Sequence, residues 1–366
     1  MGHEYNIKVD GVDVFLNDNV SGNWVGTSVE FLTQKSLKQL IESSLVNIAK
    51  EDPKIFSGIP SMGIHLETIH HIDSSLINVV KGYYEVPRQR FSQLVEIYME
   101  RNGLKRTVNL AVQEYEGRIT LNVDAIMLKS MIDCVDLETK LRQTLHHECV
   151  HVKQKYMGVF AKLDRKYYNL SKKANSYFNK KFRLDGNNTS LSFLFGCLRE
   201  VMEIFEEKTL GEGLATINAG GIFFSDKTRS NMYIQADVAL HNFFSSLEAW
   251  EDQALKTFNN KNDYADWVKH ERDLLAQQAH AAGRYFGAHA FFEIINFAGS
   301  KGRLEYDQLV CNDFPSLIKV YCDSIRDKKP LVGLHIWYGA KYNLGKEIGK
   351  IHQLRKEIEK RWLIRK

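Results

Sequence analysis

The sequence LETKLRQTLHHECVHVKQKY, residues 137–156, predicts one long amphipathic helix. Asp136 precedes it as an N-cap, where a short acidic side chain accepts hydrogen bonds from the first turn. At about 100° per residue, the apolar side chains form an arc roughly 120° wide. These side chains are Leu137, Leu141, Leu145, Cys149, Val152 and Tyr156. We therefore expect a helix that packs against a core on one side and faces a cleft on the other.

The same helix carries the pattern His-Glu-x-x-His outside that arc. His147 and His151 lie one turn apart and about 40° apart around the axis, so both imidazoles can reach one ion. Such a pair supplies two vertices of a tetrahedral zinc site. Glu148, about 100° round from His147, lies beside such an ion, where a carboxylate can take a proton from water. We expect two metal ligands and a general base here, and His146 as an exposed neighbour.

A catalytic zinc site needs a third protein ligand and one open position. Gln154 and Met157 occupy the places where metzincins have a glycine and a third histidine. The other solution is a glutamate from a later helix, and Glu212, between Gly211 and Gly213, fits it. Small neighbours let this backbone come close to the first helix, and the helix dipole favours a carboxylate at a helix start. Rival glutamates stand nearby: Glu200, Glu203, Glu206 and Glu207.

With these two motifs the chain resembles the gluzincin metallopeptidases, in particular zinc proteases in which HExxH is followed by a distant Glu-Gly-x-Ala helix. The resemblance covers roughly residues 105–300. It implies a zincin-like core, Zn²⁺ as cofactor, and hydrolysis of peptide bonds in a peptide or protein substrate. The residues that match are His147, Glu148 and His151 in the first motif and Glu212, Gly213 and Ala215 in the second.

The resemblance also assigns roles beyond the ligands. A strand before the active helix would form the cleft edge that receives an extended substrate, and Arg118–Val123 fits it. A donor on a later helix would stabilise the developing oxyanion. Tyr285 is the candidate, with a plain core tyrosine as the alternative; His280 and His289 are further candidates. Thr216 stands where thermolysin-like enzymes carry an aspartate that orients a ligand histidine, so that support must come from elsewhere.

The rest of the chain predicts an α+β, predominantly helical fold with a small antiparallel sheet. Asp10-Gly11 predicts a hairpin within Tyr5–Leu16. A second hairpin is expected from Thr107–Val112 and Arg118–Val123, and a strand from Ile64–Ile72. Thr27 is expected to cap a helix that ends near Lys50. Later helices are expected at Leu191–Lys208, Glu212–Asn218, Ala236–Phe258, Trp267–Ala281, Phe286–Phe297 and Gly345–Leu363.

A chain of 366 residues has room for more than one domain. We expect an N-terminal α/β region (1–95), a zincin-like metallopeptidase domain (96–300) and a C-terminal helical region (301–366). Within the second, residues from about 159 to 190 are expected to form a helical insertion. The basic, aromatic-rich part of that insertion, Lys162–Arg183, reads as a solvated helical arm rather than as a surface for RNA or anionic membrane.

Charge and cysteine content limit the partners and the compartment. A net charge of +4 is too mild for a dedicated nucleic-acid binder, which needs concentrated basic surface. Five cysteines without a CxxC pair indicate reduced thiols in the cytoplasm. Neither a signal peptide nor an apolar run of about 20 residues is visible. The C-terminal helix is basic, with nine Lys/Arg against three Glu from Lys341 onward, and is expected to dock on the catalytic domain or a partner helix.

Three functions remain open on the sequence. The first is a zinc metallopeptidase, acting as an endopeptidase or an aminopeptidase. The second is a metal hydrolase for a substrate other than a peptide. The third is a non-catalytic binding or scaffold protein that retains the zincin fold. Glu148 argues against the third, because such a protein has no need of a carboxylate at that place.

Overall fold

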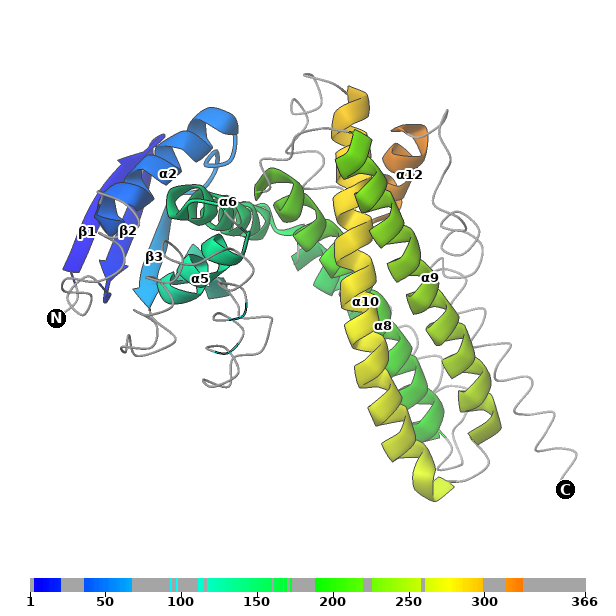
Figure 1. Ribbon diagram of the computed structural model, residues 1–366. Helices are drawn as coiled ribbons and strands as arrows, with labels where there is room; N and C mark the ends of the chain where they lie inside the picture. Colours follow the sequence, from blue (N-terminus) through cyan, green and yellow to red (C-terminus); the bar gives the residue numbers. More distant parts are fainter. Residues whose placement is uncertain are drawn as a thin grey trace, which may run out of the picture. The chain divides into compact units, whose positions relative to one another are not determined.

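A computed structural model of the chain is shown in Figure 1. The chain divides into two compact units. The first comprises Met1–Met157 with Asn218–Gly221, and the second Gly158–Ile217 with Ile222–Lys366. The structure describes residues 3–20, 36–67, 93, 97, 111–114, 117–133, 135–159, 161–166, 168–169, 172, 188–219, 226–257, 261–298 and 314–324.

The first unit contains a five-stranded mixed sheet in the order β1-β2-β3-β5-β4. The antiparallel hairpin of β1 and β2 lies at one end, and the antiparallel pair of β4 and β5 at the other. β3 lies between them and runs parallel to both β2 and β5. The predicted antiparallel pairing is confirmed for β4 and β5, but the sheet as a whole is mixed, because β3 joins the two hairpins through parallel pairing. The strands are β1 His3–Val9, β2 Val12–Asp18, β3 Ser61–Glu67, β4 Ala111–Glu114 and β5 Arg118–Asn122.

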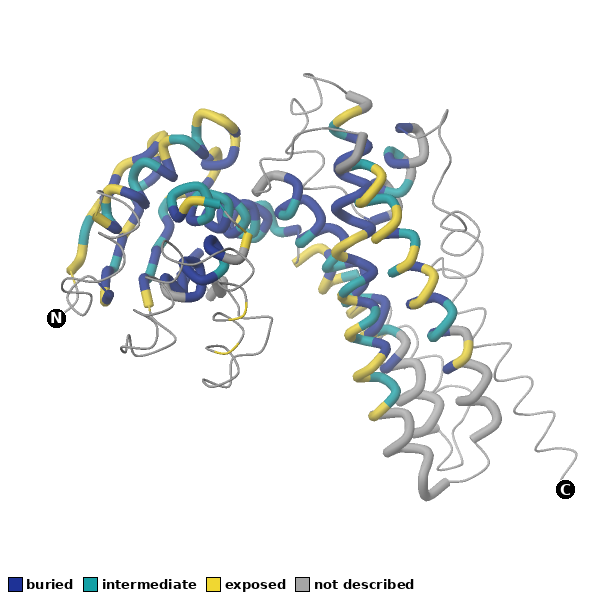
Figure 2. Tube along the Cα trace, in the orientation of Figure 1, coloured by how far each residue is buried: buried dark blue, intermediate teal, exposed yellow. Residues whose placement is uncertain are grey.

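The first hairpin forms where the sequence predicts it. Asp10 and Gly11 have φ values of 49° and 83°, and the two-residue turn between paired Val9 and Val12 needs positive φ at both positions. Alternate residues of β1 and β2 are then buried and exposed, as Figure 2 shows along these strands. One face of the sheet thus belongs to the core.

In the described part of the first unit the sheet is accompanied by three helices: α2 Leu37–Glu51, α5 Val123–Asp133 and α6 Leu137–Tyr156. α2 begins after Ser36, whose extended backbone and side chain form a capping box with Gln39. The described helix therefore begins at Leu37, and the expected cap, Thr27, lies outside the described residues. Its end near Lys50 is confirmed. α5 was not expected from the sequence.

α6 has the predicted bounds, and its caps explain them. The Asp136 side chain accepts a hydrogen bond from the Thr139 backbone N–H at 2.8 Å. At the other end Gly158 has a φ of +68°, a left-handed conformation that ends helices. α6 contacts α2, α5 and β4, so it is held on several sides of the first unit. Tyr156 departs from the predicted apolar arc, since it is 40% exposed.

The second unit is helical in its described parts: α8 Asn188–Ala219, α9 Asp226–Thr257, α10 Lys261–Ala298 and α12 Phe314–Ser324. Its core is an aromatic cluster in which Phe205 of α8 lies 5.3 Å from Phe243 of α9, centre to centre, and 5.6 Å from Phe314 of α12. Phe286 of α10 joins it, 6.3 Å from Phe205. Each helix thus contributes at least one ring to one core.

α8 and α10 are each continuous where the sequence predicts two helices. The expected breaks were at the glycines around Glu212 and around Tyr285. Instead, Gly213 and Gly287 lie where the two helices touch: a Cβ on Gly213 would lie 2.5 Å from the Gly287 backbone, and one on Gly287 would lie 2.3 Å from Thr209 O. The glycines are therefore required by close packing between the helices and not by a turn.

The described fold is α+β and predominantly helical, as the sequence predicts. The expected boundary near residue 95 falls inside the first unit, since β3 and β5 share one sheet. Several expectations concern residues outside the described part, among them the helix Gly345–Leu363, the strand residues Thr107–Leu110 and most of Lys162–Arg183. No described helix combines the length and apolarity needed to cross a bilayer.

Candidate metal centre

The two histidines of the motif face each other on α6. Their Nε2 atoms lie 3.1 Å apart, and the rings meet edge to face at an interplanar angle of 83°. Two nitrogens bonded to one zinc at about 2.05 Å in a tetrahedral arrangement lie about 3.3 Å apart. His147 and His151 thus have the spacing of two ligands on one ion. Both are half-buried.

Gln154 holds the second imidazole. Its side-chain oxygen lies 3.2 Å from Nδ1 of His151, and the glutamine is fully buried. Because an amide oxygen only accepts, the proton of the neutral ring lies on Nδ1, and Nε2 keeps its lone pair for a ligand bond. Partners of this kind orient metal-binding histidines. From the sequence, Gln154 was considered only as the residue that stands where metzincins have a glycine. Its position three residues after His151 on the same helix is the signal that could have identified it as the hydrogen-bond partner of that histidine.

Glu148, which lies between the two histidines in the sequence, is buried, with 8% of its surface exposed. Its neighbour Cys149 is completely buried, and burial, followed by the charges of Glu148 and Asp52, raises the pKa of its thiol far above the usual value. The thiol is therefore a core group and not a metal ligand. Burial likewise raises the pKa of Cys197 to about 11, and both cysteines are free thiols, as expected.

His146 is not the exposed neighbour that the sequence predicts. It is 3% exposed, and its Nε2 lies 3.8 Å from Oδ2 of Asp52, the residue that caps the C-terminus of α2. Because α2 packs on α6, this side of the motif is interior. His146 therefore belongs to the packing of α2 on α6.

Glu212 lies within α8, about two turns before its C-terminal end and not at a helix start, so the helix dipole gives it no special support. Its carboxylate is part-buried and accepts from Lys208 Nζ at 3.4 Å. His147 and His151 belong to the first unit and Glu212 to the second, and among the described residues these three form the group whose side chains could hold a metal ion.

The rival glutamates are engaged elsewhere in the second unit. Glu206 is fully buried and pairs with Lys166 at 2.7 Å. Glu200 lies 3.6 Å from Arg272, and Glu207 lies 3.8 Å from Lys208. Burial raises the pKa of Glu203 and neighbouring acids raise it further, while the charge of Arg199 lowers it. No described group of metal ligands contains any of the four.

Basic groups surround Glu212 within the second unit. A Cβ on Gly283 of α10 would lie 2.9 Å from Lys208 Cβ, so this part of α10 lies beside Lys208. His280 and Arg284 flank Gly283 and share a face of α10, since they are one turn apart. Burial, and then the charges of Lys208 and Arg284, lower the pKa of His280, while the charge of Glu212 opposes them.

The structure places Tyr285 away from this group. Gly283 and Gly287 face α8, and at about 100° per residue Tyr285 points about 180° from them. It is 41% exposed, so it is not a core tyrosine either. His289 is 3% exposed and lies between Tyr233 and Tyr321 in the core of the second unit. Of the three candidate donors, His280 is the one beside Glu212.

The strand expected at the cleft edge is internal. β5 pairs with β3 on one side and β4 on the other, so β4, which contacts α6, is the outer strand of this end of the described sheet. The hairpin that the sequence predicted explains this: its first strand, β4, covers the edge of β5.

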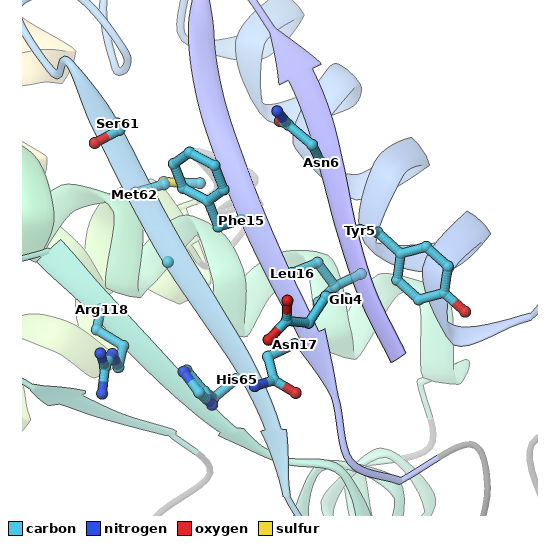
Figure 3. A pocket seen from close by; sticks show the side chains of 11 residues that line it. Glu4, Tyr5, Asn6, Phe15, Leu16, Asn17, Ser61, Met62, His65 and Arg118 are labelled. Atoms are coloured by element: carbon cyan, nitrogen blue, oxygen red, sulfur yellow. The ribbon is translucent and has the colours of Figure 1, made fainter. Parts of the chain in front are cut away.

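A separate hollow of about 520 Å³ lies on the face of the sheet formed by β1, β2, β3 and β5. Phe15 of β2 and Arg118 of β5 stand on either side of β3 (Figure 3), and both are paired with Gly63 of that strand. His65 also lines it, but no described metal-ligand group includes His65. His70 and His71, which follow His65 closely in the sequence, lie outside the described residues.

No protein-family model, curated protein or solved structure matches this chain.

Proposed function

We propose that the protein is a zinc-dependent peptide hydrolase that binds its ion through His147, His151 and Glu212. The observation that carries this proposal is the 3.1 Å separation of the two Nε2 atoms, with Gln154 fixing the His151 tautomer. Two imidazole nitrogens and one carboxylate are a donor set that catalytic zinc sites use, and three protein ligands leave a coordination position open. The HExxH and Glu-Gly-x-Ala motifs support the same assignment.

The residues present fit the ion on chemical grounds. Two imidazole Nε2 atoms 3.1 Å apart need a proton or a cation between them, because two lone pairs at that distance would repel each other. The carboxylate adds a negative charge to this donor set. When bound, zinc supplies a Lewis acid that polarises a carbonyl group and makes water more acidic.

Glu148 is proposed as the general base. It is buried on the same helix, directly after His147, so its carboxylate is held by the helix and is shielded from bulk water. It accepts the proton of the attacking water and delivers it to the amine that leaves, so the carboxylate is regenerated in each cycle. Peptide bonds are the favoured substrate because of the resemblance, and a reducing compartment such as the cytoplasm suits the free Cys149 and Cys197.

Metal content and hydrolysis test the two halves of the proposal separately. We expect one zinc per chain by elemental analysis of the purified protein, and loss of zinc in His147→Ala, His151→Ala and Glu212→Ala. His241→Ala, an exposed histidine of α9, and Glu200→Gln, an exposed rival of α8, are the matched controls and should keep the metal.

Hydrolysis is measured with a mixed peptide library and mass spectrometry. We expect Glu148→Gln to keep zinc and to cut no peptide bond, at least about 10²-fold slower than the parent. Zinc binding without cleavage of any peptide would indicate a hydrolase for another substrate. A parent protein with no zinc at neutral pH would leave the scaffold alternative and would end the proposal.

A further inference from the structure

The basic groups beside Glu212 bear on what the site accepts. Lys208 lies 3.4 Å from the Glu212 carboxylate and is 25% exposed, so its charged end reaches solvent. It also lies 3.8 Å from Glu207, which is 43% exposed. Lys208 is thus a cation at the surface with two acidic neighbours, one of which is a proposed metal ligand.

Arg284 adds a second positive charge on the neighbouring helix. It is exposed, and it follows Gly283, whose backbone lies against Lys208 Cβ. Within the described parts of the chain, no carboxylate is found paired with Arg284. Lys208 and Arg284 therefore lie on adjoining faces of α8 and α10, and this closeness is fixed by the glycine contact between the helices.

Metal binding changes the balance of charge around Lys208. A carboxylate that donates to a divalent cation has less negative charge to offer a neighbouring ammonium group. Of the two carboxylates described beside Lys208, Glu207 alone then offers its full charge, at 3.8 Å, while the ion and Arg284 add positive charge. A loaded centre with these neighbours attracts an anionic group and repels a cationic one.

We propose that Lys208 and Arg284 form a recognition site for a carboxylate of the substrate, so that the favoured peptides carry an acidic side chain or a free C-terminus close to the bond that is cut. This inference rests on the proposed function for the place of the bond, but the recognition itself is a property of α8 and α10. Carboxylates bind lysine and arginine through charge-assisted hydrogen bonds, which neutral amides cannot replace.

Binding is measured without turnover, on the zinc-loaded full chain carrying Glu148→Gln. Three pools of mixed octapeptides with an uncharged fluorophore are compared by fluorescence anisotropy. The first has Asp and Glu side chains and an amidated end, the second has Asn and Gln with a free C-terminus, and the third has Asn and Gln with an amidated end. The first two pools separate the two sources of carboxylate.

We expect at least one anionic pool to bind about tenfold more tightly than the neutral pool, which corresponds to about threefold for each partly exposed cation. The preference should shrink in 0.5 M salt, since screening weakens such contacts. Lys208→Met with Arg284→Met should remove it, whereas Lys208→Arg should keep it. Arg272, a partly exposed arginine twelve residues before Arg284 on α10, is the matched control, and Arg272→Met should leave the preference for anionic peptides unchanged.

Equal binding of all three pools, or a preference that survives the double substitution, would overturn the inference. Zinc content is checked in every variant, so a lost ligand is not mistaken for a lost recognition site. Peptide cleavage without charge preference refutes this inference alone. Charge preference without any cleavage by the parent refutes the peptidase and leaves the recognition site standing.

Discussion

At the scale of single residues, the contact between His151 and Gln154 determines what the histidine pair can do. An imidazole that is free to rotate would lose part of its binding energy to ordering. Here the ring is held at 3.2 Å by a fully buried amide. The ligand is therefore oriented before the ion arrives.

Replacing Gln154 tests this role. We expect Gln154→Leu to weaken zinc affinity about 10- to 100-fold, because an outer partner of a ligand histidine is lost. Gln154→Glu retains an acceptor and should bind zinc as well as the parent or better. Affinity is measured by competition with a chromophoric chelator, with thermal unfolding to check the fold. Equal affinity of the leucine variant and the parent would show that Gln154 does not orient the ring.

Some of the candidate site was readable from the sequence, and some was not. The approach of His147 and His151 follows from the helical repeat alone, since residues four apart share a face. The hydrogen-bond partner of His151 was missed because Gln154 was considered only as the residue that replaces a glycine, although it lies three residues after His151 on the same helix. The exposed position of Tyr285 was missed because it depends on which face of α10 packs on α8, and packing partners are not contained in a local pattern.

At the scale of elements, glycines in α8 and α10 gave the largest error of sequence interpretation. A glycine inside a helical pattern lowers helix propensity, so two of them next to polar residues predict a break. In the structure the cost is offset by close contact between the two helices at Gly213 and Gly287. Whether a glycine ends a helix or serves its packing depends on a neighbour distant in sequence.

The contact is tested by adding one methyl group. In Gly287→Ala the new Cβ would lie 2.3 Å from Thr209 O, so the helices must separate. We expect a loss of about 3 kcal/mol in the free energy of unfolding, at the upper end of ordinary overpacking. Gly63→Ala is the control, since its Cβ would meet Arg118 Cγ at an ordinary 3.6 Å. Urea titration measures both, and a Gly287 variant as stable as the control would contradict this view of the interface.

The N-cap of α6, Asp136, makes a contribution to the stability of the folded chain that depends on pH. Burial raises the pKa of the Asp136 carboxyl. Hydrogen bonds from the backbone and the side chain of Thr139 lower this pKa by more, so it lies below its usual value. A lowered folded-state pKa means that this contribution is present above the unfolded pKa and is lost as pH falls through the folded one. The cap should therefore matter at neutral pH and not in strong acid.

We expect Asp136→Ala to destabilise the protein by about 1 kcal/mol at pH 7. The difference in the free energy of unfolding between the variant and the parent should narrow as the pH is lowered below about 4, because the Asp136 carboxylate of the parent then takes up a proton. Asp136→Asn, which caps without a charge, should lose less at pH 7 and show a flatter pH dependence. Chemical denaturation at several pH values measures this, and a pH-independent difference for the alanine variant would contradict it.

The sheet shows why topology was harder to predict than its elements. Both hairpins are local and follow from their turns, Asp10-Gly11 in one case. The pairing of β3 with β2 and β5 joins segments more than 40 residues apart in sequence. Parallel pairing needs a long connection, and no short-range pattern specifies which strands it brings together. The sequence predicts the two hairpins, but the order of the strands in the sheet follows only from the structure.

At the scale of the whole molecule, the proposed ligands lie far apart in the chain, with 60 residues between His151 and Glu212. An ion that binds all three side chains binds the folded chain and only weakly the unfolded one, so it raises the free energy of unfolding by mass action. At a free zinc concentration about 100 times the dissociation constant, this increase is about 2.7 kcal/mol.

Calorimetry of the full chain can show whether the distant carboxylate takes part. We expect zinc to raise the unfolding temperature of the parent by several degrees, and a chelator to reverse the rise. Glu212→Gln removes the ligand charge but keeps the size of the side chain, so it should lose most of the shift, while Glu207→Gln, five residues earlier on α8, should keep it. Equal shifts in both variants would mean that the histidine pair binds zinc without Glu212, and the third ligand would have to be sought elsewhere.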